Sequence, residues 1–169
     1  FRNRGDGTFE NIADEAGVAD PAENVRGAVA MDANRDGQFD LVYGNWEGPH
    51  RMWLRDEGDT FELATPDAME EPSRIRTVIA ADFDHDTREE LFWNNIGQPN
   101  RLFERRDGAW TQADIGAARE PRGAGTGGAV GDLDGDGWLD LLVSRGESKA
   151  QPLTLYVTEP HEDRHGLRV

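Results

Sequence analysis

Apolar and polar stretches alternate along this chain in a way that predicts short β-strands separated by polar loops. Small apolar runs at 26–31, 76–81 and 126–131 each lead into an acidic loop, and a second apolar run follows at 41–43, 91–93 and 141–143. The second runs are rich in β-branched and aromatic residues, a composition typical of strands. Because the pattern returns every fifty residues, we expect a structural repeat.

Each repeat continues with a third run, at 51–54, 101–104 and 154–157, and two repeats add a short hairpin partner, at 59–63 and 108–111. Four short strands in about fifty residues are the pattern of β-propeller blades. Residues 1–10 match the third and fourth strands of a further unit. We therefore expect an all-β chain of about three complete blades of four antiparallel strands plus a partial one, a fragment of a larger propeller. The expected units are 1–20, 21–70, 71–120 and 121–169.

Glycine and alanine in the first strand of each unit fit an innermost position, where strands converge and large side chains would clash. Aromatic residues are expected to pack between neighbouring blades rather than to form a carbohydrate-stacking strip. The aromatic set is Trp46, Trp53, Phe61, Phe92, Trp93, Phe103, Trp110, Trp138 and Tyr156.

The acidic loops carry the main chemical signal. Side-chain oxygens at loop positions 1, 3 and 5, with a tight turn at position 6, suit a hard cation that takes six to eight oxygen ligands, Ca²⁺ before Mg²⁺. A position 7 carbonyl and a position 9 carboxylate would complete each set. The expected ligands are Asp32, Asn34, Asp36, the Gln38 carbonyl and Asp40; Asp82, Asp84, Asp86, the Arg88 carbonyl and Glu90; and Asp132, Asp134, Asp136, the Trp138 carbonyl and Asp140.

An EF-hand shares the first half of this pattern but needs a bidentate Glu at position 12, on an exiting helix. Position 12 is Tyr43, Trp93 or Val143, within a run that reads as a strand. A solvated turn that binds nothing is the alternative for a single loop, and three loops in register favour metal binding. Up to three Ca²⁺ ions are expected. The second loop is the weakest site, because Thr87 replaces the turn glycine and Glu90 replaces the last Asp.

Charge and composition narrow the function classes. The net charge of −16 disfavours nucleic acid and anionic membranes as partners, because both would repel the chain. No apolar segment approaches the length of a membrane span, so membrane insertion is not expected. With no cysteine, the chain has no disulfide framework, and calcium becomes the expected staple. Loop sites of this kind usually work where calcium is near millimolar, which favours a secreted, cell-surface or periplasmic setting.

The order of small-apolar strand, acidic loop and apolar strand resembles the FG-GAP (VCBS) repeats of integrin α-subunits and many secreted proteins. The resemblance implies a seven-bladed propeller with calcium in such loops. The segments at 40–51, 76–84, 92–96 and 144–153 are similar to the cartilage acidic protein family. Its members join such a propeller to a C-terminal ASPIC/UnbV domain. Residues 166–169 resemble the entry to that domain, which is expected to lie outside this chain.

We therefore expect a calcium-binding extracellular module that recognises a protein or glycan and is not an enzyme. A purely architectural carrier of the C-terminal domain is the main alternative, and a propeller hydrolase or lyase is a further one. Nearly every clustered acid is accounted for by calcium ligation, and no nucleophile elbow or phosphate-binding loop stands in the sequence. His50, after Pro49, is expected in a surface loop. Open propeller edges could also support self-association.

One short motif has two interpretations. Arg4-Gly5-Asp6 is the tripeptide that integrins read, and it falls in an expected hairpin turn. Gly5-Asp6-Gly7 is also ordinary turn chemistry, as in Arg35-Asp36-Gly37, and we prefer this second interpretation.

Overall fold

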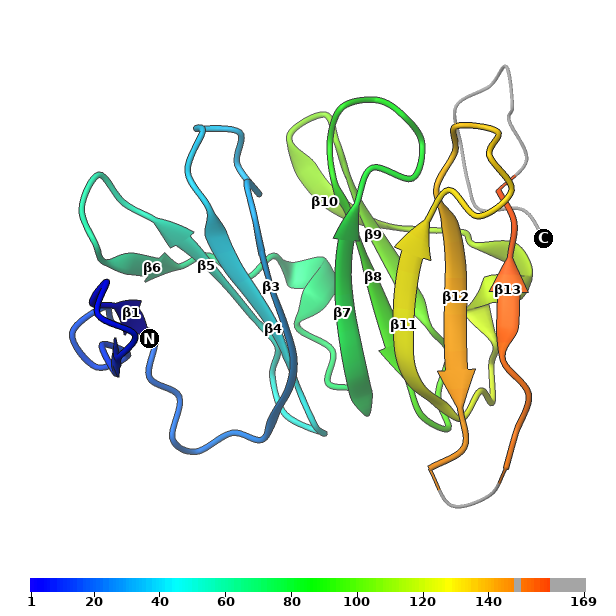
Figure 1. Ribbon diagram of the computed structural model, residues 1–169, viewed down its shortest axis with the longest axis horizontal. Coiled ribbons are helices and arrows are strands. Elements are labelled where there is room, and N and C mark those ends of the chain that lie inside the picture. The colour runs from blue at the N-terminus through cyan, green and yellow to red at the C-terminus, as the bar shows by residue number, and fades with distance from the viewer. Residues whose placement is uncertain (148–149, 159–169) are drawn as a thin grey trace.

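The computed structural model describes residues 1–147 and 150–158, and its strands form four antiparallel sheets (Figure 1). The sheets consist of the hairpin β1 (Arg2–Asn3) and β2 (Phe9–Glu10); β3 (Val25–Met31), β4 (Asp40–Asn45), β5 (Arg51–Arg55) and β6 (Phe61–Leu63); β7 (Ile75–Ala81), β8 (Glu90–Asn95), β9 (Arg101–Arg106) and β10 (Ala109–Ala113); and β11 (Gly125–Gly131), β12 (Asp140–Arg145) and β13 (Thr154–Tyr156). There are two short 3-10 helices: η1 (Asp67–Met69) precedes β7, and η2 (Gly116–Arg119) precedes β11.

The sheets are arranged as successive blades. Within each sheet the strands pair in chain order, and the first strands of successive sheets contact one another, β3 with β7 and β7 with β11 (Figure 1). Two sheets have four strands, and the third has three among the described residues. The prediction of an all-β chain of four-stranded antiparallel blades is confirmed.

The hairpin β1–β2 has the turn that its sequence indicates. Gly5 and Gly7 have φ values of 79° and 88°, and the Thr8 amide donates to Asp6 Oδ1 over 2.9 Å. The carboxylate of Asp6 is thus part of the turn, which supports turn chemistry as the role of this tripeptide.

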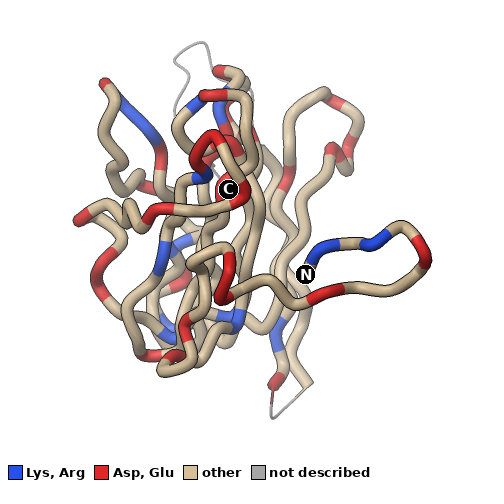
Figure 2. The backbone as a smooth tube through the Cα atoms, turned by 90° about the vertical axis from the view of Figure 1, so that its left-hand side faces the viewer, with Lys and Arg blue, Asp and Glu red and all other residues tan. Residues whose placement is uncertain are grey.

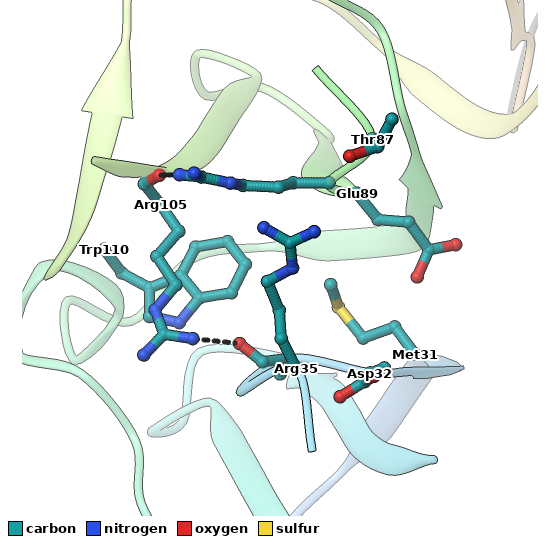
Figure 3. A pocket seen from close by; sticks show the side chains of 9 residues that line it. Met31, Asp32, Arg35, Thr87, Glu89, Arg105 and Trp110 are labelled. Carbon is teal, nitrogen blue, oxygen red and sulfur yellow. Dashed lines mark hydrogen bonds between the residues drawn. The ribbon is translucent and has the colours of Figure 1, made fainter. Parts of the chain in front are cut away.

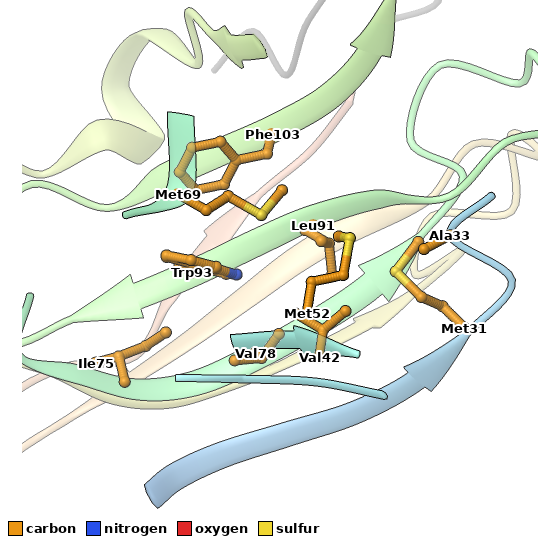
Figure 4. Close-up of a cluster of buried hydrophobic side chains, with 10 residues drawn as sticks. All are labelled: Met31, Ala33, Val42, Met52, Met69, Ile75, Val78, Leu91, Trp93 and Phe103. Carbon is orange, nitrogen blue, oxygen red and sulfur yellow. The ribbon is translucent and has the colours of Figure 1, made fainter. Parts of the chain in front are cut away.

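The core lies between the blades, in two clusters. Alternate side chains of β8 point to opposite faces of its sheet, so Leu91 and Trp93 join the cluster shared with the first blade and Phe92 joins the cluster shared with the third. All three are fully buried. Figure 4 shows the first cluster, where Met52, Met69 and Phe103 surround Trp93 and Leu91 from other strands and from η1. The buried aromatics predicted between blades thus include Phe92, Trp93, Phe103 and Tyr156.

Four of the predicted interblade aromatics, Trp46, Trp53, Phe61 and Trp138, lie outside both clusters. Trp46 carries the guanidinium of Arg76 at 4.7 Å and that of Arg26 at 5.8 Å from its ring centroid. Arg26, Arg76 and Thr126 each occupy the register shift near the start of an inner strand, where a bulge re-aims the side chain. Thr126 places its hydroxyl near the Ser144 carbonyl oxygen instead, at 3.4 Å. Trp138 stacks on the ring of His85.

Two glycines allow the first blade to approach the second closely. A Cβ atom on Gly27 would lie 2.7 Å from the backbone nitrogen of Val78, and one on Gly44 would lie inside the side chain of Ile75. Packed heavy atoms do not approach one another so closely, so both positions require glycine.

A buried polar chain also links the first two blades, and it corrects the expectation for His50. His50 is 1 % exposed, not in a surface loop; its Nδ1 accepts the Asn45 amide at 3.1 Å and its Nε2 lies 3.2 Å from Ser73 Oγ. Ser73 donates to Asn95 Oδ1 over 2.8 Å. Burial, followed by the charge of Arg101, lowers the His50 pKa to about 4.

The second blade repeats this arrangement with a different residue. Asn100 occupies the position equivalent to His50, and its Oδ1 accepts the Asn95 amide at 2.9 Å. In both blades the preceding asparagine, Asn45 or Asn95, donates its side-chain amide to the carbonyl oxygen of the proline in the loop. The Pro-containing loops are therefore held by side chain to backbone hydrogen bonds.

We expect Gly27→Ala to lower the free energy of unfolding by about 1–3 kcal/mol, because the new methyl group would overlap the backbone of β7. The matched control is Gly131→Ala, at the inner-strand position that Ala81 occupies in the second blade, where the nearest atom to the new Cβ lies 3.7 Å away. Urea denaturation of both variants measures the difference. Equal losses would contradict the proposed close approach.

We expect His50 to make folding sensitive to acid. A base with a depressed pKa stabilises the fold fully above its unfolded value of 6.5, and this contribution disappears as pH falls through the folded value of about 4. His50→Asn, which copies Asn100, should remove up to about 3 kcal/mol of the stability difference between pH 7 and pH 4. Urea denaturation with a chelator at both pH values tests this. An unchanged pH dependence would show that His50 is not the responsible group.

Candidate metal sites in the acidic loops

The three acidic loops connect the first and second strands of each blade, and they lie at the same end of the molecule (Figure 1). Residues 32–39 join β3 to β4, residues 82–89 join β7 to β8, and residues 132–139 join β11 to β12. Because each loop follows an inner strand, it stands near the converging edges of the blades. The repeat thus brings three similar groups of oxygen atoms to one surface.

The loops fold alike because their first carboxylate collects backbone amides. The residue at position 6 donates to Oδ2 of the position 1 aspartate, at 3.0 Å in the first and second loops and 3.1 Å in the third. The position 7 amide donates to the position 5 aspartate at 2.8 Å in all three loops. These bonds draw the carboxylates at positions 1, 3 and 5 towards a common centre.

The carboxylate triads of the second and third loops are compact. Within Asp82, Asp84 and Asp86, and within Asp132, Asp134 and Asp136, one carboxylate oxygen from each residue lies within 4.8 Å of the others. The first loop has an amide at its middle position. Asn34 accepts the Asp36 amide at 3.0 Å through Oδ1 and donates to Asp36 Oδ2 over 2.8 Å through Nδ2. The amide oxygen of Asn34 remains a suitable ligand for a hard cation.

The position 9 carboxylates are buried and tie each loop to the blade. Asp40 Oδ2 accepts the Ala33 amide at 2.9 Å, and its Oδ1 accepts the Arg55 amide of β5 at 2.8 Å. Asp140 binds the Leu133 and Thr158 amides in the same way, at 2.9 Å and 3.0 Å. Glu90 accepts the Phe83 amide at 2.8 Å. A carboxylate oxygen has more than one lone pair, so it can accept an amide hydrogen and still bind a metal. Metal binding by these three carboxylates stays a prediction.

Burial, together with repulsion between neighbouring carboxylates, raises the pKa of two acidic groups in the second loop. Burial, followed by Asp86, Asp82 and Glu104, raises the Asp84 pKa. Burial, followed by the charges of Asp84, Asp82 and Asp86, raises the Glu90 pKa to about 8. For an acid with a raised pKa, the fold is favoured below the ordinary value and loses this advantage as pH rises through the folded value. A bound divalent cation would offset this loss near neutral pH.

The backbone of the loops enters the left-handed region twice. At position 6 the φ values are 85° for Gly37, 70° for Thr87 and 93° for Gly137, as anticipated from the turn chemistry. At position 4 they are 67° for Arg35, 58° for His85 and 83° for Gly135. Only the third loop has glycine at position 4, so two loops gave no sequence signal for this second requirement. Thr87 carries the larger strain, because it is β-branched.

The family comparison matches this geometry. A family described as FG-GAP-like repeat matches residues 32–93 and 82–143, and each match begins at position 1 of an acidic loop. The two matches together span most of the chain. The chain belongs to the FG-GAP-like repeat family.

Curated relatives of this FG-GAP-like chain share its whole length. Cartilage acidic protein 1 from Homo sapiens is 47 % identical to it and that from Xenopus tropicalis is 46 % identical, each over 100 % of this chain. The chain spans only 27 % and 28 % of these proteins, about a quarter of their length. Among the described residues, no helix is both long and apolar enough to span a membrane.

We expect Thr87→Gly to stabilise the protein. A residue with a side chain in the left-handed region costs the folded state roughly 1–2 kcal/mol, and glycine avoids this cost. The greater conformational freedom of glycine in the unfolded chain offsets about 0.5–1 kcal/mol of that gain in stability. A rise of about 1–4 °C in the melting temperature should follow. Thr87→Ala keeps a Cβ at the same φ and should gain less. Calorimetry that ranks alanine above glycine would show that φ strain is not limiting in this loop.

Proposed function

We propose that this FG-GAP-like chain is a calcium-binding extracellular module, in which calcium fixes the loop end of each blade and the assembled surface recognises a protein or glycan. The supporting observation is the repeated gathering of oxygen ligands in the acidic loops. In two loops the carboxylate triad is compact enough to hold one cation, and the first loop shares with them the hydrogen bond from the position 6 amide to its position 1 carboxylate.

Calcium fits these loops better than other common metals. The donor atoms are carboxylate and amide oxygens, with backbone carbonyls available, and neither cysteine nor histidine stands at a ligand position. Such donors suit Ca²⁺, Mg²⁺ or Mn²⁺ rather than zinc or copper. Irregular loops with many oxygens accommodate the higher and more flexible coordination of Ca²⁺ more easily than the strict octahedron of Mg²⁺.

The large acidic excess favours a setting with abundant calcium. The chain has 34 acidic and 18 basic residues, and Figure 2 shows acidic residues along loops around the molecule. Three Ca²⁺ ions would bring the net charge from −16 to −10. Weak loop sites fill at the millimolar calcium concentration of extracellular spaces. The relatives are named cartilage acidic protein 1, and this name supports an extracellular setting for the chain.

The described side chains support a binding role better than an enzymatic role. His50 and Ser73 form the one described pair that resembles a nucleophile and base, and both are 1 % exposed within the blade interface. A substrate could not reach this pair without separating the blades. The alternative, an architectural carrier for a further domain, predicts calcium binding without any ligand for the loop surface.

Calcium should raise the melting temperature, because it binds the folded loops and relieves repulsion between their carboxylates. At a concentration about 100 times the dissociation constant, one ion adds about 2.7 kcal/mol, which corresponds to roughly 5–10 °C for a chain of this size. Differential scanning calorimetry in chelator, in millimolar Ca²⁺ and in millimolar Mg²⁺ measures the gain. Equal melting temperatures in chelator and calcium would refute the proposal.

A pair of variants separates specific sites from general screening. Asp136→Asn removes one charge of the third triad and should reduce the calcium-induced gain. Asp107→Asn removes an exposed charge in the β9–β10 turn, where asparagine tolerates the positive φ of 50°, and should leave the gain unchanged. Equal effects of the two substitutions would indicate screening of surface charge rather than a site.

A further inference from the structure

A cavity of about 320 Å³ lies between the first and second blades, beside their acidic loops. Its wall includes Arg35 from the first loop, Arg88 from the second, and Arg105 and Trp110 from the outer strands of the second blade. In Figure 3, Arg35 and Arg105 lie on the side of Trp110, and the carboxylates of Asp32 and Glu89 lie on the opposite side. The cavity therefore has a basic side and an acidic side.

The guanidinium groups of the basic side are held mainly by backbone carbonyls, and Arg88 also has one acidic partner. Arg105 Nη1 donates to the Ala33 carbonyl oxygen across the blade interface over 3.1 Å, and Arg88 Nη1 donates to the Arg105 carbonyl oxygen over 3.2 Å. Arg88 Nε is buried with no hydrogen-bond acceptor, and it forms a long ion pair with Asp86 Oδ2 at 3.6 Å. Arg35 forms no ion pair within the described part of the chain.

The next blade interface shows how the repeat closes the equivalent space. There, position 4 of the second loop is His85 and position 7 of the third loop is Trp138, and their rings stack at 4.4 Å with an interplanar angle of 5°. The corresponding pair between the first two blades is Arg35 and Arg88. Two guanidinium groups repel one another and cannot close the space as the His–Trp stack does. An anion between them would supply the charge that the protein does not.

One of the two carboxylates on the acidic side, that of Asp32, is already engaged within its loop. Both carboxylate oxygens of Asp32 already accept loop amides, from Asp36 at 3.0 Å and from Gly37 at 3.0 Å. Calcium in the first loop would further offset its charge. The basic side then presents forked donors beside an indole ring, the combination that grips an oxyanion and packs against the apolar face of its carrier.

We propose that this cavity binds a sulfate- or carboxylate-bearing sugar residue. The arginines hold the oxyanion, and Trp110 packs against the ring. A sugar fits better than a peptide side chain, because the apolar wall lies beside the anion site within one compact cavity of about 320 Å³ rather than along an extended groove. This inference rests on the proposed function, since it specifies the glycan class among the possible partners.

The test uses the whole chain in saturating calcium and follows the tryptophan indole signals by NMR. The probes are N-acetylglucosamine 6-sulfate, glucuronic acid and uncharged N-acetylglucosamine, with an acetylated Glu–Glu dipeptide as a further arm. At least one acidic sugar should bind at least about tenfold more tightly than the neutral sugar, as expected for one or more charge-assisted hydrogen bonds. The sulfated and carboxylated probes distinguish the two anions. Tighter binding of the dipeptide, or equal binding of the neutral sugar, would overturn the assignment.

Two variants locate the site. Arg35→Gln should weaken acidic-sugar binding about tenfold or more, whereas Arg4→Gln, on the N-terminal hairpin, should leave it unchanged. The double variant Arg35→His with Arg88→Trp copies the stacked pair of the next interface, so it should abolish binding while the melting temperature is kept or raised. Undiminished binding in this folded double variant would overturn the proposal. The calcium gain in melting temperature, measured on the same samples, separates this outcome from failure of the calcium-binding function.

Discussion

Close contact between the innermost strands of successive blades is the constraint on which the structure depends. Each blade exposes apolar side chains on a face that only the next blade can cover, so stability comes from the interfaces and not from a core within one sheet. Gly27 lets β3 approach the backbone of β7, and this approach brings the side chains of β4, β5 and β8 into one cluster. Elements farther out, including the acidic loops and the arginine-lined cavity, take their relative positions from this contact.

The acidic loops are fastened to this framework by their last carboxylate. Asp40 reaches back to the start of its loop and across to β5, and Asp140 does the same between its loop and Thr158. These buried bonds hold the loop ends while the first three ligand positions remain at the surface. The divided role explains why the last carboxylate of each loop is buried while the first three ligand positions are half-buried or exposed.

Much of this architecture could be predicted from the sequence, because its signals are local and repeated. The fifty-residue period, the β-branched runs and the Asp-Gly loops gave the strands and their order. His50 was misplaced because its burial depends on Ser73 and Asn95 from the next blade, and no local pattern reports such a contact. The positive φ at Arg35 and His85 was also hidden, since neither residue is a glycine. The cavity depends on which side chains meet across an interface, so only the assembled blades reveal it.

The two-sided burial of β8 has a consequence for motion and for sequence change. All six of its residues are buried, whereas β3 has one residue buried and exposes others to solvent. Both faces of the sheet at β8 are shielded from solvent, so its backbone amides should exchange more slowly than those of β3. Substitutions in β8 must satisfy two neighbours at once. Substitution in this strand is thus limited by both interfaces, although the loop that precedes it departs from the Asp-Gly pattern at Thr87 and Glu90.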